Sequence, residues 1–181
     1  MRITKVTTKT GDEGKTSLGD GQRVLKNHVI INALGDLDHL NSIVGWVGIS
    51  SLSKKTSEDL KSIQQDIFNI SGDISLPSKK SNLLKEERIS FLEHEIKLMS
   101  KKLPPLKEFI LPGGSELNAR LHIARTTSRS TERSLVAMQQ DKGINALHAR
   151  YLNRLSDYLF LLARTAGLAK NIEEEHWELN K

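Results

Sequence analysis

Cysteine is absent from the 181-residue sequence, proline occurs four times, and aromatic residues make up only 4% of the chain. Without cysteine there can be no disulfide, no cysteine-based zinc site and no thiol nucleophile. No apolar run reaches the roughly 18 residues that a membrane span requires, and the N-terminal residues lack the apolar core of a signal peptide. These absences predict a soluble, cytoplasmic protein with no membrane partner.

Nucleic acid is not an expected partner either. Lys and Arg total 27 against 22 Asp and Glu, a formal charge of +5, but the two signs are interleaved along the chain. With so few aromatic residues, no series of rings is available on which bases could stack. The small positive excess suits either a compact polyanion such as a nucleotide phosphate or simple solubility, and composition leaves both open.

The length fits a single domain over residues 1–181, in which three parts differ in residue pattern. Residues 1–26 are rich in Thr, Gly, Asp and Lys without an apolar period, which predicts an extended or looped segment. Over 27–169 apolar residues recur three or four positions apart, which predicts an all-α fold. Residues 170–181 predict a fraying helical tail. The expected helices span 27–52, 56–76, 83–102, 115–141 and 143–169.

The longest break between the expected helices, 103–114, contains three of the four prolines around an apolar Phe109-Ile110-Leu111. Such a composition indicates a structured loop. Ser115 is a suitable N-cap for the following helix, since its hydroxyl can accept from a free backbone N–H group. Gly143 is expected to end that helix.

The fourth expected helix has two stripes with alternating spacing of four and three residues. The apolar stripe is a bundle seam with small residues in its middle, where close approach of a neighbouring helix is the favoured interpretation and space for a ligand the alternative. It consists of Leu117, Leu121, Ala124, Ser128, Thr131, Leu135 and Met138.

The polar stripe beside the seam consists of Asn118, His122, Arg125, Arg129 and Glu132. Arg125 and Arg129 lie one turn apart, and like charges at that spacing repel unless an anion or acid lies close to them. The stripe is therefore either a solvated face with a structural Arg–Glu pair or part of an anion-binding site. Periodicity alone favours neither.

Three further groups of polar residues are weaker candidates. Asn153 and Asp157 share a face of the fifth helix, where a structural hydrogen bond is the simpler interpretation. Asp36, Asp38 and His39 do not converge as metal ligands, although Asp38 could pair with an arginine of another helix or subunit. The N-terminal Gly14-Lys15-Thr16 is not a Walker A loop, because Lys9 stands where that motif requires glycine. The loop could still grip a polyphosphate, or be an ordinary surface loop.

Four segments, taken in order, resemble the PduO-type ATP:cob(I)alamin adenosyltransferases. They are TKTGDEGKTSL, GDLDHLNSIVG, FILPGGSELNARLHIARTTSRSTER and YLNRLSDYLFLLAR. The likeness spans nearly the whole chain, and four collinear segments are more specific than any single motif. The resemblance implies a five-helix bundle with ferritin-like, four-helix-bundle packing. It also implies a homotrimer that binds ATP between neighbouring subunits.

The resemblance also implies which residues form that shared site. Arg129, Arg125 and Asp38 resemble the residues that support catalysis, and Asp38 resembles an acid that pairs with Arg125 across the subunit interface. No side chain is expected to bind a metal directly. The residues that resemble the family's ATP-binding residues are Thr8, Lys9, Thr10, Gly11, Asp12, Gly14, Thr16 and Lys26 in the loop and Arg125, Arg129, Glu132 and Asn153 on the helices.

The implied reaction transfers the 5′-deoxyadenosyl group of ATP to the cobalt(I) of cobalamin or another corrinoid, with tripolyphosphate leaving. Cobalt is the nucleophile, so the protein would position ATP and Mg²⁺ and stabilise the charge on the leaving group. Phe109 resembles an apolar residue that crowds the lower face of the corrin; its alternative role is to anchor the loop. A corrinoid reductase is an implied partner.

Two residues depart from the family pattern that the resemblance implies. Ser130 stands where a second arginine is usual, so no ATP contact is inferred at that position, and His39 stands where an acid is usual. Two other functions compete with the transferase: a non-catalytic ATP-binding helical assembly protein and an ATP-dependent phosphotransferase. The three predict different products, which an assay can separate.

Overall fold

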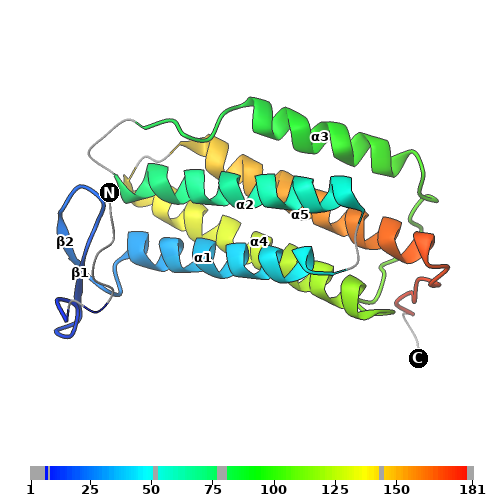
Figure 1. Cartoon of the computed structure of the whole chain (residues 1–181), viewed down its shortest axis with the longest axis horizontal. Helices are drawn as coiled ribbons and strands as arrows, with labels where there is room; N and C mark the ends of the chain where they lie inside the picture. The colour runs from blue at the N-terminus through cyan, green and yellow to red at the C-terminus, as the bar shows by residue number, and fades with distance from the viewer. Residues whose placement is uncertain (1–6, 8, 51–52, 77–80, 143–144, 179–181) are drawn as a thin grey trace.

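A computed structural model describes residues 7, 9–50, 53–76, 81–142 and 145–178. Five helices dominate it (Figure 1), which confirms the predicted helical bundle. They are α1 (Val29–Gly48), α2 (Lys54–Ser75), α3 (Glu87–Ser100), α4 (Glu116–Lys142) and α5 (Ala146–Ala169). Each begins and ends within four residues of the span expected from apolar periodicity.

Helix α4 lies at the centre of the packing. It packs against α5 and α1, while α2 covers α1 and α3 lies on α5 (Figure 1). All seven residues of its predicted seam are buried. The small residues in the middle serve close packing, because the Ser128 hydroxyl donates to the Leu152 carbonyl of α5 at 2.8 Å and Thr131 donates to the Asp36 carbonyl of α1 at 3.2 Å. The favoured interpretation of the small residues is therefore confirmed.

Side-chain caps set the starts of four helices. The Ser115 hydroxyl accepts from the N–H of Asn118 at 3.1 Å, which confirms the predicted cap of α4. His28, Ser53 and Asn145 accept in the same way at the starts of α1, α2 and α5. Helix α4 ends at Lys142, and the predicted role of Gly143 lies outside the described residues.

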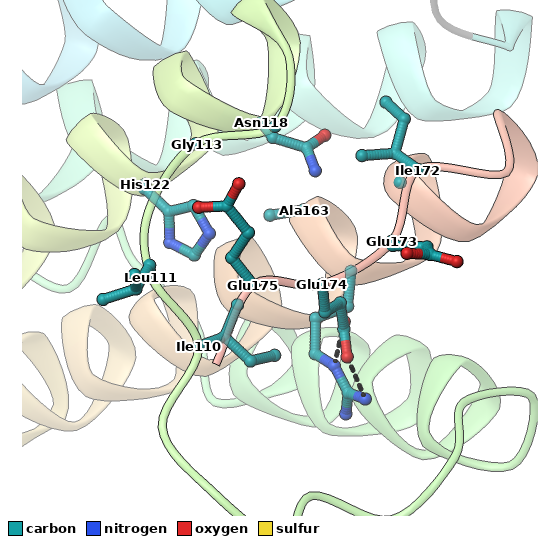
Figure 2. Close-up of a pocket in the computed structure, with 13 residues that line it drawn as sticks. Ile110, Leu111, Gly113, Asn118, His122, Ala163, Ile172, Glu173, Glu174 and Glu175 are labelled. Atoms are coloured by element: carbon teal, nitrogen blue, oxygen red, sulfur yellow. Dashed lines mark hydrogen bonds and ion pairs between the residues drawn. The ribbon is translucent and has the colours of Figure 1, made fainter. Parts of the chain in front are cut away.

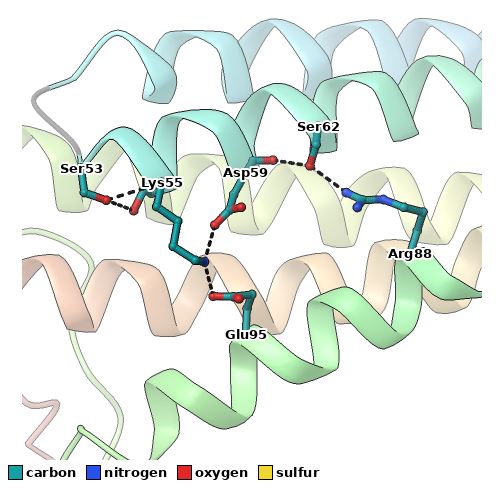
Figure 3. A network of polar contacts seen from close by, with 7 residues as sticks. Ser53, Lys55, Asp59, Ser62, Arg88 and Glu95 are labelled. Carbon is teal, nitrogen blue, oxygen red and sulfur yellow. Dashed lines mark hydrogen bonds and ion pairs between the residues drawn. The ribbon is translucent and has the colours of Figure 1, made fainter.

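Helix α3 has few buried apolar side chains, and polar contacts join it to α2 (Figure 3). Lys55 of α2 donates to Asp59 at 2.9 Å and to Glu95 of α3 at 2.7 Å. Deeper in the bundle, Arg88 of α3 donates to both carboxylate oxygens of Asp66, the nearer at 2.7 Å. The buried Tyr151 of α5 also donates to Asp66 at 2.7 Å. One carboxylate thus links three helices.

The N-terminal segment contains a β-hairpin, so the prediction of a plain extended or looped segment was incomplete. β1 (Lys15–Ser17) pairs antiparallel with β2 (Arg23–Leu25), and Gly21 in the connecting turn has φ +88°, which glycine adopts without strain. Leu18 and Val24 are buried in the core. The Gly19 N–H donates to the Ser75 carbonyl at the end of α2 at 2.9 Å, so the hairpin is tied to one end of the bundle.

Residues 170–178, the described part of the segment after α5, are not helical, so the prediction of a fraying helical tail was wrong there. Residues 172–177 run beside the loop before α4, where His176 forms an antiparallel bridge with Ile110. The Leu111 N–H donates to the Glu175 carbonyl and the Trp177 N–H donates to the Phe109 carbonyl, both at 2.8 Å. Backbone pairing therefore holds the tail against the loop that carries Phe109.

Candidate functional site

Arg125 and Arg129 lie one turn apart near the middle of α4, and no carboxylate of the described chain forms an ion pair with either. Arg125 is half-buried and Arg129 is exposed. Burial lowers the pKa of Arg125, and the nearby charge of Arg129 lowers it further. Arg125 nevertheless remains a cation at any ordinary pH. The face carries two positive charges that nothing in the described part of the chain neutralises.

His122 lies one turn before Arg125 and contacts it directly. The Nε–H of Arg125 donates to Nδ1 of His122 at 3.3 Å, and the two side chains lie against the Phe160 ring of α5. His122 is only 6% exposed. Its burial and the neighbouring Arg125 charge both lower its pKa, so the imidazole is neutral at pH 7.

Glu132 and Asn153 complete the polar face on α4 and α5. The Asn153 amide donates to Glu132 at 3.5 Å, and its oxygen accepts from Arg154 at 2.9 Å. Asn153 and Asp157 are linked through Arg154, whose guanidinium reaches both, and not by a direct hydrogen bond. The structure thus places Glu132 and Asn153 together, on the same side of α4 as the two arginines.

Asp36 and Asp38 of α1 differ in their surroundings. Asp36 accepts a hydrogen bond from the Ser134 hydroxyl and so joins α1 to α4. Asp38 is exposed, and within the described chain it makes no ion pair with Arg125. Its carboxylate is therefore available to another molecule.

A hollow of about 890 Å³ opens beside Arg125. Phe109, which is 78% exposed, and Trp177 form part of its wall, with ring centroids 6.3 Å apart in an edge-to-face arrangement. Phe160 and His122 line it as well. The hollow thus combines an aromatic wall with one guanidinium, a combination suited to a large flat ligand with an anionic neighbour.

A smaller cavity of about 20 Å³ shares Ile110 and His122 with the hollow and lies between the loop, α4, α5 and the tail (Figure 2). Asn118, His122 and Glu175 line it. At its edge the buried Arg164 of α5 donates to both carboxylate oxygens of Glu174, at 2.7 and 3.0 Å (Figure 2), and to the Pro104 carbonyl at 3.0 Å. This bidentate pair anchors the tail to the bundle.

The predicted nucleotide-binding loop lies beside the hairpin, at the end of the bundle where α1 begins (Figure 1). The chain turns at Lys9, with φ 59°, and at Gly14, with φ 75°. The Lys26 ammonium lies so close to Gly11 that an added Cβ there would be 3.2 Å from it. Arg23 holds the turn by donating to the Thr10 carbonyl at 2.7 Å. Asp12 and Thr16 belong to the same turn and strand, and Thr8 lies outside the described residues.

Among the described residues, the loop and the arginine face do not meet within one chain. The hairpin lies at the end of the bundle where α1 begins, whereas Arg125 and Arg129 lie near the middle of α4 (Figure 1). No hydrogen bond or ion pair joins the loop to Arg125, Arg129, Glu132 or Asn153 among the described residues. One described chain therefore holds two separate halves of the predicted site.

Sequence reasoning missed the contributions of Phe160, Trp177 and Glu174. Phe160 belongs to an apolar run of α5 and gave no separate signal. The tail after Lys170 combines Glu173, Glu174 and Glu175 with Trp177, and this composition was the only local signal for its role. Pairing of that tail with a loop more than sixty residues earlier is a tertiary contact that local pattern does not reveal.

Among the described residues, no group of three or more His, Asp or Glu side chains is arranged to hold a metal ion. The described helices include none that is both long and apolar enough to cross a membrane.

Comparison with known proteins gives concordant results for sequence and structure. Residues 6–166 match the family model described as cobalamin adenosyltransferase. The chain is 42% identical to a cobalamin adenosyltransferase of Cupriavidus metallidurans over 178 residues, which cover 98% of this chain and 96% of the relative. It is 39% identical to a corrinoid adenosyltransferase of Bacillus subtilis, over 96% of this chain and 92% of the relative.

A solved structure has the same fold. It is a variant of a PduO-type ATP:corrinoid adenosyltransferase from Lactobacillus reuteri complexed with cobalamin and ATP. The two structures superpose with a TM-score of 0.89 at 34% sequence identity, covering 96% of this chain and 99% of the other. The family model and both relatives cover most of the chain, and so the chain belongs to the cobalamin adenosyltransferase family, as a member of the PduO type.

Proposed function

We propose that this protein transfers the 5′-deoxyadenosyl group of ATP to the cobalt(I) of a corrinoid, giving adenosylcobalamin and tripolyphosphate when the acceptor is cobalamin. The observation that carries the proposal is the unneutralised Arg125–Arg129 pair beside an aromatic hollow. A polyphosphate would supply the missing negative charge, and the hollow would take the flat corrin. The solved relative bound to cobalamin and ATP supports the same pair of substrates.

The protein is proposed to act as a homotrimer in which each site is shared by two subunits. The support is the separation of the nucleotide loop from the arginine face within one chain. A closed cyclic assembly brings different surfaces of neighbouring copies together at every interface. In that arrangement the exposed Asp38 of one subunit would pair with Arg125 of the next and neutralise part of its charge.

ATP would be held from both sides of this interface. The ammonium groups of Lys9 and Lys26 and the backbone N–H groups around Gly11 and Gly14 form an anion-binding turn on one side. Thr8, Thr10, Asp12 and Thr16 belong to the same proposed set. On the other side Arg125 and Arg129 would contact the phosphates, and Glu132 and Asn153 the nucleoside. Mg²⁺ would enter as part of the substrate, bound to triphosphate oxygens.

The proposed chemistry is an in-line displacement at the ribose C5′ of ATP. The cobalt(I) electron pair forms the Co–C5′ bond, the C5′–O bond breaks, and tripolyphosphate leaves with the bonding electrons. The protein supplies no nucleophile. Its contribution is to align the two substrates and to place fixed positive charge where the leaving group becomes more negative.

Phe109 would act on the corrinoid side. Its exposed ring projects at the rim of the hollow and is held by backbone pairing of its loop with the tail. An apolar ring against the lower face of the corrin would exclude a ligand there, and cobalt without that ligand is easier to reduce to cobalt(I). The absence of cysteine suits a reducing cytoplasm, where a corrinoid reductase would supply the reduced substrate.

The proposal is tested by mixing the protein with MgATP and chemically reduced cobalamin under anaerobic conditions. Conversion of the cob(I)alamin spectrum to that of adenosylcobalamin, with tripolyphosphate detected by ³¹P NMR, is the expected result. Samples without ATP, and with hydroxocobalamin left unreduced, are the controls. ADP with a phosphorylated acceptor would indicate a phosphotransferase, and ATP binding without turnover would indicate an assembly protein; either result overturns the proposal.

A further inference from the structure

His122 is the residue nearest to the Arg125 guanidinium on α4, and it accepts a hydrogen bond that the reaction scheme above does not use. Nε–H of Arg125 donates to Nδ1 of His122 at 3.3 Å. The histidine is 6% exposed, packs edge-to-face on Phe160 at 6.2 Å, and lines both the hollow and the small cavity. A buried ring held from two sides can fix the direction of the arginine.

This contact determines which arginine donors remain free. A guanidinium has five N–H donors in one plane, and using Nε–H for His122 leaves the four N–H groups of Nη1 and Nη2. Those two nitrogens form the fork that pairs with a carboxylate or phosphate by two parallel hydrogen bonds. Fixing Nε on His122 therefore limits the rotation of the guanidinium and leaves the fork free to pair with an anion.

The contact also requires one protonation state of His122. Nδ1 can accept only when the ring is neutral with its proton on Nε2, because a protonated imidazole has two donors and no acceptor. A protonated ring would place a second positive charge beside Arg125. Burial and Arg125 both lower the pKa of His122, which favours the accepting form.

The other charged groups around His122 come from three elements. Arg164 of α5 and Glu173, Glu174 and Glu175 of the tail line the small cavity with it. Lys107 and Glu108 of the loop and Glu178 of the tail line the hollow. Arg164 and Glu174 neutralise one another, so they do not change the balance at the ring. The remaining acids are exposed, and among these charged groups Arg125 is the one with a hydrogen bond to the ring.

We propose that neutral His122 is a positioning residue of the transferase, which holds Arg125 by its Nε so that both Nη groups face the shared site. The inference rests on the proposed function and adds a proton-dependent support behind one of its arginines. Protonation of His122 would release Arg125 and push it from its position. Activity would then fall toward acid through the loss of this one contact.

Two variants at this position separate positioning from packing. His122→Asn keeps a neutral acceptor where Nδ1 stands, whereas His122→Leu keeps the bulk and removes the acceptor. At pH 7.5 we expect the Leu variant to lose about tenfold in kcat/KM, the effect of one hydrogen bond to a charged group. The Asn variant should stay within about twofold of the wild type. His94→Asn, at an exposed histidine of α3, is the matched control.

The pH profile gives the decisive readout. As the pH falls from 7.5 to the lowest value at which the proteins stay folded, the ratio of kcat/KM for His122→Asn to that of the wild type should rise, because asparagine does not protonate; the His94→Asn ratio should stay constant. A constant ratio for His122→Asn would overturn the proposal, as would full activity of His122→Leu. If the Leu variant does not fold, the Asn profile decides alone.

A measurement without turnover distinguishes failure of this inference from failure of the proposed function. In ¹⁵N-histidine-labelled wild type, NMR should show His122 neutral with the proton on Nε2 at pH 7. That result with an inactive wild type would leave the His122 contact standing and reject the transferase. An active wild type with the proton on Nδ1 would reject the His122 contact alone.

Discussion

At the scale of single residues, Arg125 and Arg129 matter most for the proposed function, because neither forms an ion pair with a carboxylate of the described chain. Arg129 is exposed, and within the described chain its guanidinium has no carboxylate partner. A solvated structural Arg–Glu pair was one interpretation of this stripe, but Glu132 accepts from Asn153 and from neither arginine. The side chain of Arg129 therefore contributes little to folding and is free to contact a ligand.

Replacing Arg129 by alanine should separate activity from stability. We expect turnover to fall about 30- to 1,000-fold, corresponding to about 2–4 kcal/mol of lost stabilisation of the leaving group. The free energy of unfolding should change by less than about 0.5 kcal/mol. Steady-state kinetics and urea unfolding measure the two effects. Arg150→Ala is the control, since Arg150 is 59% exposed in a surface pair with Glu86; unchanged turnover in Arg129→Ala would move the site elsewhere.

Histidine protonation should make the fold sensitive to mild acid. Buried His148 donates from Nε2 to Asp73 at 3.1 Å, and the N–H groups of Leu83 and Leu84 also donate to this carboxylate. Burial lowers the pKa of His148 below its ordinary 6.5, although Asp73 opposes that shift. Burial alone would raise the pKa of Asp73, but its hydrogen bonds lower it. The folded pair is thus a neutral imidazole and an ionised carboxylate.

The sign of the pH effect follows from those directions. The unfolded chain protonates histidine more readily, so the contribution of His148 to the free energy of unfolding is fully present above pH 6.5 and is lost as the pH drops through the folded pKa. His148→Gln keeps a donor to Asp73 and does not titrate. The slope of the unfolding free energy with pH reports how many protons the chain takes up on unfolding. Between pH 7 and 5 this number should be smaller in His148→Gln than in the wild type, by up to about one proton. Urea unfolding across this range measures it, and an identical slope in both proteins would contradict the assignment.

At the scale of elements, the helices were predictable and their polar connections were not. The seam of α4 repeats over six turns, so its apolar period reports burial directly. The strands of the hairpin have only three residues each, too few for an alternating pattern to stand out. The tail takes its shape from pairing with a distant loop. The hairpin and the tail depend on contacts between segments that are far apart in the sequence. Apolar periodicity in one sequence does not reveal such contacts.

The residues of the candidate site likewise fall into those that the sequence predicted and those that it did not. Arg125, Arg129 and Glu132 could be found because one helix spaces them regularly. Phe160 and Trp177 could not, because they reach the hollow from α5 and from the tail. Glycine and lysine in the N-terminal loop gave an ambiguous signal until the turn around Gly11 and Lys26 was visible. Resemblance to a family supplied the reaction, which spacing alone did not.

Helix α3 should depend on the Arg88–Asp66 pair for its attachment. Asp66 is buried, and burial raises its pKa even though Tyr151 and Arg88 favour the ionised form. Arg88→Leu would leave this carboxylate without its cation and should destabilise the protein by about 2–4 kcal/mol. Adding Asp66→Asn should recover part of the loss. Urea unfolding measures both, and a loss below about 1 kcal/mol in Arg88→Leu would contradict the role given to the pair.

At the scale of the whole molecule, the two halves of the proposed site lie apart in one chain, so the proposed function depends on how subunits assemble. The nucleotide loop is tied to one end of the bundle through the hairpin, and the arginine face opens near the middle of α4 beside the hollow (Figure 1). A homotrimer that shares each site between two copies would join them. Sedimentation should then give three times the 20.3 kDa mass of the chain.

Complementation between two inactive variants tests this account most directly. Lys9→Asn removes the loop charge while keeping a residue that tolerates φ 59°, and Arg129→Ala removes the helix charge. Each variant alone should be nearly inactive. In randomly mixed trimers roughly three quarters contain both variants, and each such trimer regains one intact site of three. Co-expression in equal amounts should therefore restore about a quarter of wild-type adenosylcobalamin formation, whereas activity no greater than the mean of the two variants assayed alone would contradict a shared site.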